Sequence, residues 1–176
     1  MCFVQVYKLH RETLYLGVDF LDRYLSSTCD MPRSRLQLVG ITCLFVAAKI
    51  EEIYPPKLRE FAFVTDGACS EEEITTMELV VLKGLNWGLS PQTPNRWLKT
   101  YMQVNSLTTA ATSKDEEDEK FVTRQFSEQD FLRAMQLMDL VILDVESLGH
   151  KYSVLAASVI YHCQDEQSAL DASGKE

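Results

Sequence analysis

The chain has 176 residues, of which 46% are hydrophobic and 24% charged, and its formal net charge is −9. This length and composition are ordinary for a soluble globular protein with one large or two small domains. The acidic balance argues against nucleic acid as main partner, because phosphate binding requires a basic surface. It leaves open a basic protein partner or a simple solubility role.

The cysteines and the N-terminal residues indicate the cellular compartment in which the protein is expected. Five cysteines without a CxxC pair favour free thiols in a reducing compartment over a disulfide framework or a zinc site. The N-terminal residues lack the basic and apolar regions of a signal peptide. We therefore expect a protein of the cytoplasm or nucleus.

The first full helix is predicted over Arg11–Ser27, where apolar side chains recur at helical spacing and acidic residues occupy the other side. The residues before it, Met1–Tyr7, are apolar and lack a cap, so we interpret them as the end of a helix whose front is missing. A short loop, Thr28–Met31, leads to Pro32, whose missing N–H costs nothing at the start of the next helix.

The central segment, Leu36–Ile53, is apolar except for Thr42 between Leu38 and Ala48. A helix that is apolar on all sides must be enclosed by other helices or by lipid. This run is shorter than the roughly 20 residues that span a bilayer, and Pro55–Pro56 end it. The pattern predicts the central helix of a soluble bundle, with charged residues at its end.

Two further helices are predicted before a linker. The first covers about Leu58–Val64. The second covers about Glu71–Trp87 and begins with Ser70 and Glu73 as a capping box. Two prolines then mark 89–94 as a linker, so the predicted domains are 1–90 and 91–176.

The second half of the chain is also predicted to be helical. A helix over Asn95–Leu107 precedes a polar and acidic loop at about 108–126, interpreted as a mobile excursion. A helix introduced by Ser127 and Asp130 is predicted to reach Ser147, and a largely apolar helix covers Tyr152–Cys163. Residues 164–176 are polar. Paired alanines late in each half suggest two helical subdomains of one design.

The sequence contains no constellation of catalytic residues. Phosphate-binding glycine loops, zinc-protease motifs, nucleophile elbows and kinase signatures are absent. The three histidines have no ligand spacing, and adjacent glutamates on a helix point apart. We therefore predict a binding protein, not an enzyme, without catalytic residues, cofactor or metal, and without membrane or nucleic-acid partners.

One motif identifies a family resemblance. Residues 44–56 read LFVAAKIEEIYPP, and this LxxAAKxEEIYPP pattern is typical of cyclin boxes. Together with the runs at 6–27, 36–70 and 77–87, the chain resembles the cyclin family. The segments EFAFVTDGACSEEEI and RWLKTYMQV, with residues 138–162, favour the E type of that family.

The resemblance implies an all-α cyclin fold, with one nearly complete helical box followed by a second, truncated box. It also implies a regulatory subunit that binds and activates a cyclin-dependent serine/threonine kinase at the transition into S phase. Such a subunit holds the kinase helix that carries the glutamate of a lysine–glutamate pair in its active position.

The resemblance also assigns site residues. Lys49 and Glu78 match the lysine and glutamate that cyclins present to the kinase. Apolar positions around them are matched by Ile50, Ile53, Leu82, Trp87 and Leu89. From spacing alone, an internal salt bridge between Lys49 and Glu78 on an ordinary surface is the favoured interpretation, and the resemblance reverses that preference.

Part of the docking groove for substrates and inhibitors is expected to be damaged. Leu36 and Gln37 match one wall of that groove, but the M-R-A-I-L segment of the other wall is absent and Cys2 replaces its glutamate. The resemblance also implies that two helices of the second box are missing, which would leave an exposed apolar patch. A splice form and a partial gene model are both open explanations.

Two alternative functions remain open at this stage. One is a fragment that binds the kinase without activating it. The other is a cyclin-fold scaffold or transcription-type binding module. The nucleus is the implied location, with cytoplasm in addition. Residues 97–104 resemble a centrosome-targeting segment, although a packed helix face explains them as well.

Overall fold

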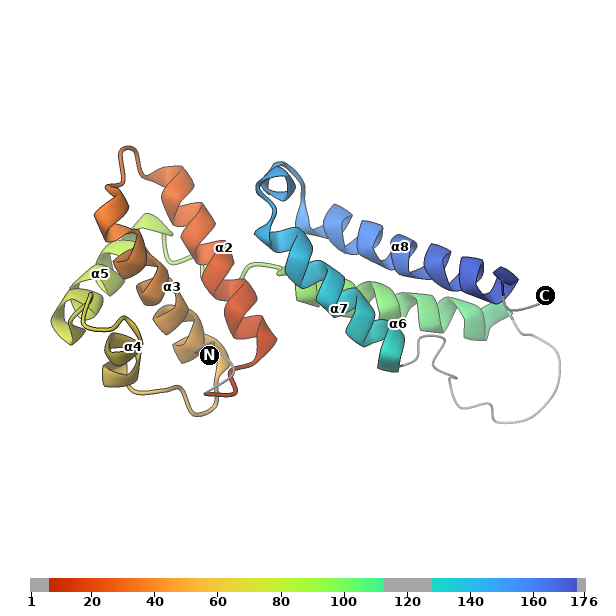
Figure 1. Ribbon diagram of the computed structural model, residues 1–176, viewed down its shortest axis with the longest axis horizontal. Coiled ribbons are helices and arrows are strands. Elements are labelled where there is room, and N and C mark those ends of the chain that lie inside the picture. The colour runs from red at the N-terminus through yellow and green to blue at the C-terminus, as the bar shows by residue number, and fades with distance from the viewer. Residues whose placement is uncertain (1–6, 113–127, 174–176) are drawn as a thin grey trace. The chain divides into compact units, whose positions relative to one another are not determined.

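The computed structural model describes residues 7–112 and 128–173, and the regular structure in these residues is entirely helical. The chain divides into two compact units, Met1–Thr93 and Pro94–Glu176 (Figure 1). The predicted all-α fold is confirmed. The first unit contains α2 (Arg11–Ser27), η1 (Arg33–Arg35), α3 (Leu36–Glu51), α4 (Leu58–Val64) and α5 (Glu71–Gly84). The second contains α6 (Pro94–Thr112), α7 (Glu128–Leu143), η2 (Val145–Gly149) and α8 (Tyr152–Ser173).

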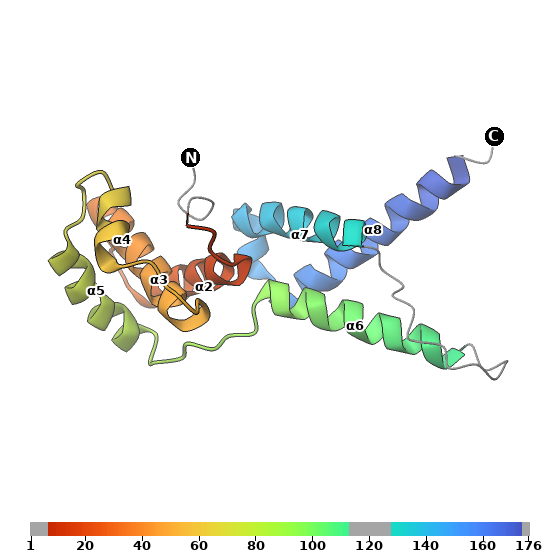
Figure 2. The same cartoon turned by 90° about the horizontal axis from the view of Figure 1, so that it is seen from below.

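Helix α3 is the centre of the first unit, as its apolar sequence predicts. It packs against α2, α4 and α5, and lies between α2 and α5 in both views of the cartoon (Figures 1 and 2). Its apolar surface is divided between two cores. Ala47 faces one and Ala48 faces the other. A helix that separates two cores has no polar face, which explains the sequence pattern.

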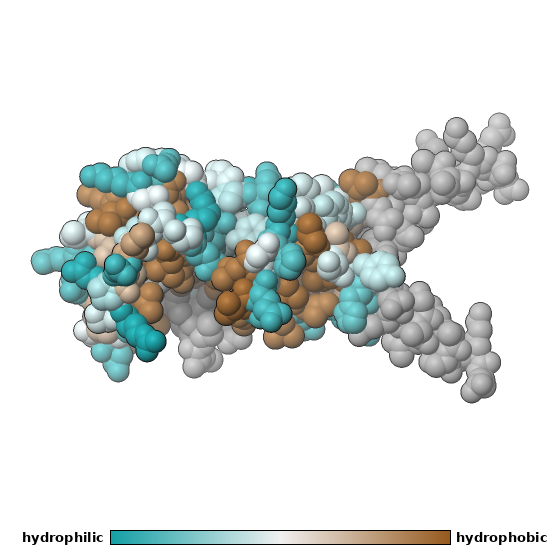
Figure 3. All heavy atoms as spheres, turned by 90° about the horizontal axis from the view of Figure 1, so that it is seen from above, coloured by the Kyte–Doolittle hydropathy of each residue, from teal (hydrophilic) through white to brown (hydrophobic). Residues whose placement is uncertain are grey.

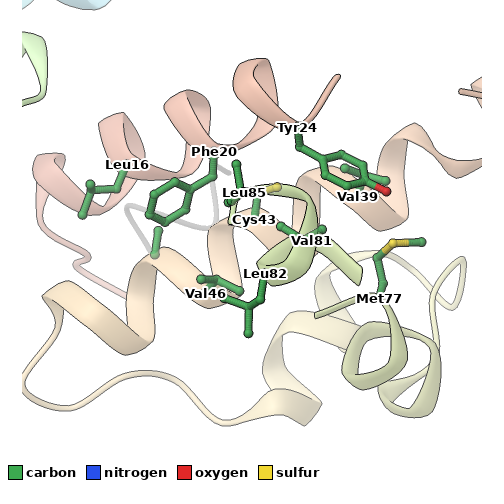
Figure 4. Packing of buried hydrophobic residues seen from close by; sticks show 11 residues of the cluster. Leu16, Phe20, Tyr24, Val39, Cys43, Val46, Met77, Val81, Leu82 and Leu85 are labelled. Atoms are coloured by element: carbon green, nitrogen blue, oxygen red, sulfur yellow. The ribbon is translucent and has the colours of Figure 1, made fainter. Parts of the chain in front are cut away.

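We call these the first and second core clusters. The first lies between α2, α3 and α5 (Figure 4) and consists of Leu16, Phe20, Tyr24, Val39, Cys43, Val46, Ala47, Met77, Val81, Leu82 and Leu85. The second lies mainly between α3, α4 and α5 and consists of Leu9, Phe45, Ala48, Phe61, Cys69 and Ile74. Within it the rings of Phe45 and Phe61 meet edge to face, with centroids 5.1 Å apart.

Several predicted boundaries are confirmed and one is wrong in the first unit. Helices α2 and α4 have the predicted ends, and the Ser70–Glu73 capping box begins α5. However, α5 ends at Gly84, and not near Trp87 as predicted. Asn86 and Trp87 adopt positive φ angles of 49° and 57°, which an α-helix cannot contain.

The second unit corrects three boundary predictions. Helix α6 continues to Thr112, so 108–112 are helical and not part of a loop. Helix α7 ends at Leu143, not at Ser147, because Asp144 is extended (ψ 127°) and its carboxylate accepts a hydrogen bond from the Glu146 amide at 3.2 Å to begin η2. Helix α8 continues through the polar residues to Ser173. The rest of the predicted acidic loop, Ser127, and Met1–Val6 lie outside the described residues.

The three helices of the second unit enclose a small core of their own. Helix α8 packs against both α6 and α7. The buried hydrophobic side chains among the described residues are Leu98, Met102, Ala134, Met135, Met138, Leu155, Ala156 and Val159. Several large apolar side chains remain exposed in this unit, among them Leu140, Leu143, Val145 and Tyr161. Hydrophobic side chains also interrupt the hydrophilic surface of the face seen in Figure 3.

Candidate functional site

The candidate site begins with the charged end of α3. Lys49 lies in the last turn of the helix, where a cation interacts favourably with the helix dipole. Its Nζ lies 4.5 Å from the centroid of the Phe45 ring, a distance at which a cation is attracted to the aromatic face. Phe45 belongs to the second core cluster. The lysine is therefore positioned by the buried part of its own helix.

Glu78 projects from α5 toward the same point. The Lys49 Nζ donates a hydrogen bond to Glu78 Oε1, which joins the end of α3 to the middle of α5. The lysine side chain is 41% exposed and the glutamate side chain 16%. An ion pair this accessible to water contributes only about 0–1 kcal/mol to folding. The structure thus brings the two predicted residues together, and their role in binding a kinase stays a prediction.

The predicted apolar residues around this pair fall into two groups. Ile50, Ile53 and Trp87 are exposed, Ile53 at 80% and Trp87 at 63%. Leu82 is buried in the first core cluster, and Leu89 packs against that cluster. The exposed group can supply contact area to a partner. In this chain, the other two serve chiefly to hold α5 and the following segment in place.

Glu52, which directly follows α3, fixes the end of the helix. Its Oε1 accepts hydrogen bonds from the backbone amide of His10 at 2.7 Å and from the Thr13 hydroxyl. The His10 imidazole Nδ1 lies 3.3 Å from Oε2. These contacts tie the end of α3 to the start of α2, next to Lys49. Sequence reasoning missed this carboxylate's role, because nothing local in the sequence connects residues about forty positions apart.

Two predicted groove residues, Leu36 and Gln37, lie at the exposed start of α3. The side-chain amide of Gln37 donates, through Nε2, to the Thr65 carbonyl oxygen at 3.5 Å. Gln37 also lines a concavity between the N-terminal parts of α3 and α5, with Leu38, Met77 and Val80 on its apolar side. Cys2, which matches a position on the opposite wall of the predicted docking groove, lies outside the described residues, so the groove stays a prediction.

Neither a metal centre nor a membrane span is found in the described part of the chain. No three His, Cys, Asp or Glu side chains in residues 7–112 and 128–173 come together as metal ligands. None of the helices there has the length and hydropathy of a transmembrane segment.

Comparison with protein families identifies the architecture. The model of the cyclin N-terminal domain matches residues 1–90, and that of the cyclin C-terminal domain matches residues 92–173. The chain belongs to the cyclin family. The predicted family resemblance is thereby confirmed.

Relatives similar to this cyclin include G1/S-specific cyclins of type E. It is 48% identical over 170 residues to G1/S-specific cyclin-E1 of Danio rerio, covering 97% of this chain and 40% of the relative. It is 51% identical over 178 residues to G1/S-specific cyclin-E of Drosophila melanogaster, covering 97% of this chain and 25% of the relative. This cyclin therefore spans well under half the length of these relatives.

A solved structure supports the fold. The viral cyclin from herpesvirus saimiri superposes with a TM-score of 0.67 over 89% of this chain and 62% of its own, at 18% sequence identity. At that identity the likeness shows the cyclin fold alone.

Proposed function

We propose that this chain is an E-type cyclin: it binds a cyclin-dependent serine/threonine kinase and activates it for entry into S phase. The observation that carries the proposal is the exposed Lys49–Glu78 pair, held where α3 and α5 meet. The proposal is supported by the similarity to G1/S-specific cyclins from several animals.

The proposed mechanism is selection of a kinase conformation. Kinase activity requires an ion pair between a lysine and a glutamate on a mobile helix. By docking beside that helix, the cyclin would hold the glutamate inward, with Lys49 and Glu78 bonding to the kinase backbone or side chains. Moving the kinase from 1% to 99% active takes a preference of about 5.5 kcal/mol for the active state. The cyclin supplies this preference and carries out no chemistry.

The exposed apolar residues would supply much of that preference. Full burial of a large apolar side chain contributes about 1.5–3 kcal/mol. Ile53 and Trp87 are mostly exposed; Ile53 follows Lys49 by four residues and Trp87 follows Glu78 by nine. Their burial against the kinase would add large apolar anchors to the two polar contacts, and a few buried side chains of this kind carry most of the affinity of an interface.

A double substitution tests this site. Lys49→Ala with Glu78→Ala removes both polar anchors, and we expect binding to a purified cyclin-dependent kinase, measured by calorimetry, to fall at least tenfold (about 1.4 kcal/mol). Helix content by circular dichroism should be unchanged, because exposed ion pairs add little to folding.

The matched control is Lys57→Ala with Glu71→Ala, which removes the same charges from exposed positions on α4's N-terminal side and the first turn of α5. Kinase affinity should be retained in this control. Unchanged affinity in the Lys49/Glu78 variant would refute the assignment of the site.

The same assays separate the finer parts of the proposal. Binding without increased substrate phosphorylation would identify a non-activating cyclin. Leu36→Ala, at the proposed docking wall, should lower phosphorylation of a substrate with a docking motif while leaving a short peptide unaffected. A nuclear location forms part of the proposal and is tested by fractionation.

A further inference from the structure

The turn that follows α5 has an unusual backbone. Asn86 and Trp87 have φ angles of 49° and 57°, in the left-handed region where a Cβ atom crowds the neighbouring carbonyl oxygen. Two consecutive residues other than glycine hold this conformation only when their surroundings fix it. Trp87 is nevertheless 63% exposed, so burial of its side chain does not fix the turn.

Among the hydrogen bonds that hold the turn, three involve Trp87 and Gly88. The Trp87 amide donates to the Leu82 carbonyl oxygen at 3.1 Å, and the Gly88 amide donates to the Leu85 carbonyl oxygen at 3.0 Å. These two bonds close the end of α5. The third comes from another helix, because Nη1 of Arg23 on α2 donates to the Gly88 carbonyl oxygen at 2.9 Å.

Arg23 is itself held in place. Its Nη1 also lies 2.9 Å from Oδ2 of Asp19, one turn earlier on α2. The Asp19 side chain is 5% exposed, whereas that of Arg23 is 38% exposed. A nearly buried carboxylate thus orients a planar guanidinium, whose fixed geometry suits a defined acceptor. The resulting brace runs from Asp19 through Arg23 to Gly88.

Gly88 provides the room for this brace. A Cβ atom at residue 88 would lie 2.9 Å from Arg23 Nη2, closer than side-chain atoms pack. Gly88 is not among the residues with positive φ, so an alanine there needs no unusual φ; its Cβ would crowd the guanidinium and lie 3.3 Å from the Leu85 carbonyl oxygen. Arg23, Trp87 and Gly88 also line one open hollow, together with Leu89, Ser90 and Pro91. Arg23 and the exposed Trp87 therefore border the same hollow.

We propose that Arg23 is a positioning residue that presents Trp87 to the kinase by bracing the Gly88 carbonyl. This inference takes the kinase partner from the proposed function. The brace itself is a feature of the free chain. Arg23 acts through Trp87: the brace keeps the left-handed turn formed before binding, so that its ordering need not occur on association.

The first test needs no kinase. The chain has two tryptophans, and Trp97→Phe leaves Trp87 as the sole emitter. In that background, Arg23→Gln and Gly88→Ala should both speed the local rotation of Trp87 in time-resolved anisotropy and raise its quenching by acrylamide. Arg59→Gln, which removes an exposed arginine from α4, is the control and should change neither. Unaltered rotation in both brace variants overturns the inference, whether or not the chain binds a kinase.

The second test asks whether Arg23 acts through Trp87. Arg23→Gln should weaken kinase binding about tenfold in the otherwise unsubstituted chain, the effect of one charge-assisted hydrogen bond. In a Trp87→Ala background the same change should have no further effect. An equal loss in both backgrounds contradicts the proposal. Gly88→Ala disturbs the brace but retains the charges of Asp19 and Arg23. A similar loss of kinase affinity in this variant would show that the effect of Arg23→Gln does not come from unfolding after loss of a charge.

Discussion

At the scale of single residues, contacts with the buried core determine where the Lys49 side chain lies and how readily the Cys43 thiol ionises. Lys49 lies over the ring of Phe45, a residue of the second core cluster, and reaches Glu78 from there. Lys49 is partly exposed and rests on the core, whereas Cys43 is itself part of the core. It is fully buried in the first core cluster, and burial, followed by the negative charge of Asp22, raises the pKa of its thiol from 9.0 to about 12.

The raised pKa of Cys43 predicts a dependence of stability on alkaline pH. Unfolding exposes the thiol, which then ionises near its ordinary pKa, while the folded chain keeps it protonated to about pH 12. The stabilisation is therefore complete below pH 9 and is lost as the pH rises toward 12, by about 1.4 kcal/mol per pH unit.

Urea unfolding at several alkaline pH values measures this slope. The free energy of unfolding should fall less steeply with pH in Cys43→Ala than in the unsubstituted chain. Cys29→Ala, which removes an exposed thiol, should leave this slope unchanged. Identical slopes in Cys43→Ala and the unsubstituted chain would contradict the predicted ionisation.

At the scale of elements, local side-chain chemistry decides where α5 begins. Ser70 Oγ accepts from the Glu73 amide at 3.2 Å, and Glu73 Oε2 accepts from the Ser70 amide at 2.8 Å. The hydrogen bonds from the Ser70 backbone and side chain lower the pKa of Glu73. Because these bonds are local, the capping box is visible in the sequence. It sets the start of the helix that carries Glu78.

Removal of this cap should weaken α5. We expect Ser70→Ala to lower the free energy of unfolding by about 1 kcal/mol, because the Glu73 amide loses its partner. Hydrogen exchange in the first turn of α5 and urea unfolding measure the effect. Ser26→Ala is the control, since that hydroxyl donates only to the Arg23 carbonyl oxygen within α2. An equal loss in both variants would show that the cap has no special role.

The whole molecule consists of two units with separate cores. Phe20 is fully buried in the first unit and Met138 in the second. The end of the first unit is fastened to α2, because the buried Thr93 hydroxyl donates to Glu12 Oε1 at 2.7 Å. Each unit can therefore lose stability through its own core.

Core truncation in one unit should leave the other protected. Met138→Ala should destabilise the second unit by about 2–5 kcal/mol, and Phe20→Ala the first unit by about 3–5 kcal/mol. Hydrogen exchange with peptide resolution should show faster exchange in α7 and α8 for Met138→Ala, with α3 unchanged. Phe20→Ala should show the reverse pattern. Faster exchange throughout the chain in both variants would mean that the two units unfold together.

The sequence by itself determined much of the helical architecture. The ends of α2 and α4, the cap of α5 and the central position of α3 follow from local spacing, capping and proline positions. Its motif at 44–56 also identified the family. These features depend on residues within a few turns of one another, which is the range over which a helical pattern can be read.

Only the tertiary structure decided how distant residues meet. It joins Lys49 to Glu78, ties Glu52 to the start of α2, and places Arg23 against Gly88. It also ended α5 at Gly84 and formed the left-handed turn at Trp87, where the apolar pattern predicted more helix. Contacts between residues tens of positions apart depend on how helices pack. No local periodicity records that packing, so the details of the site emerge only when the helices are brought together.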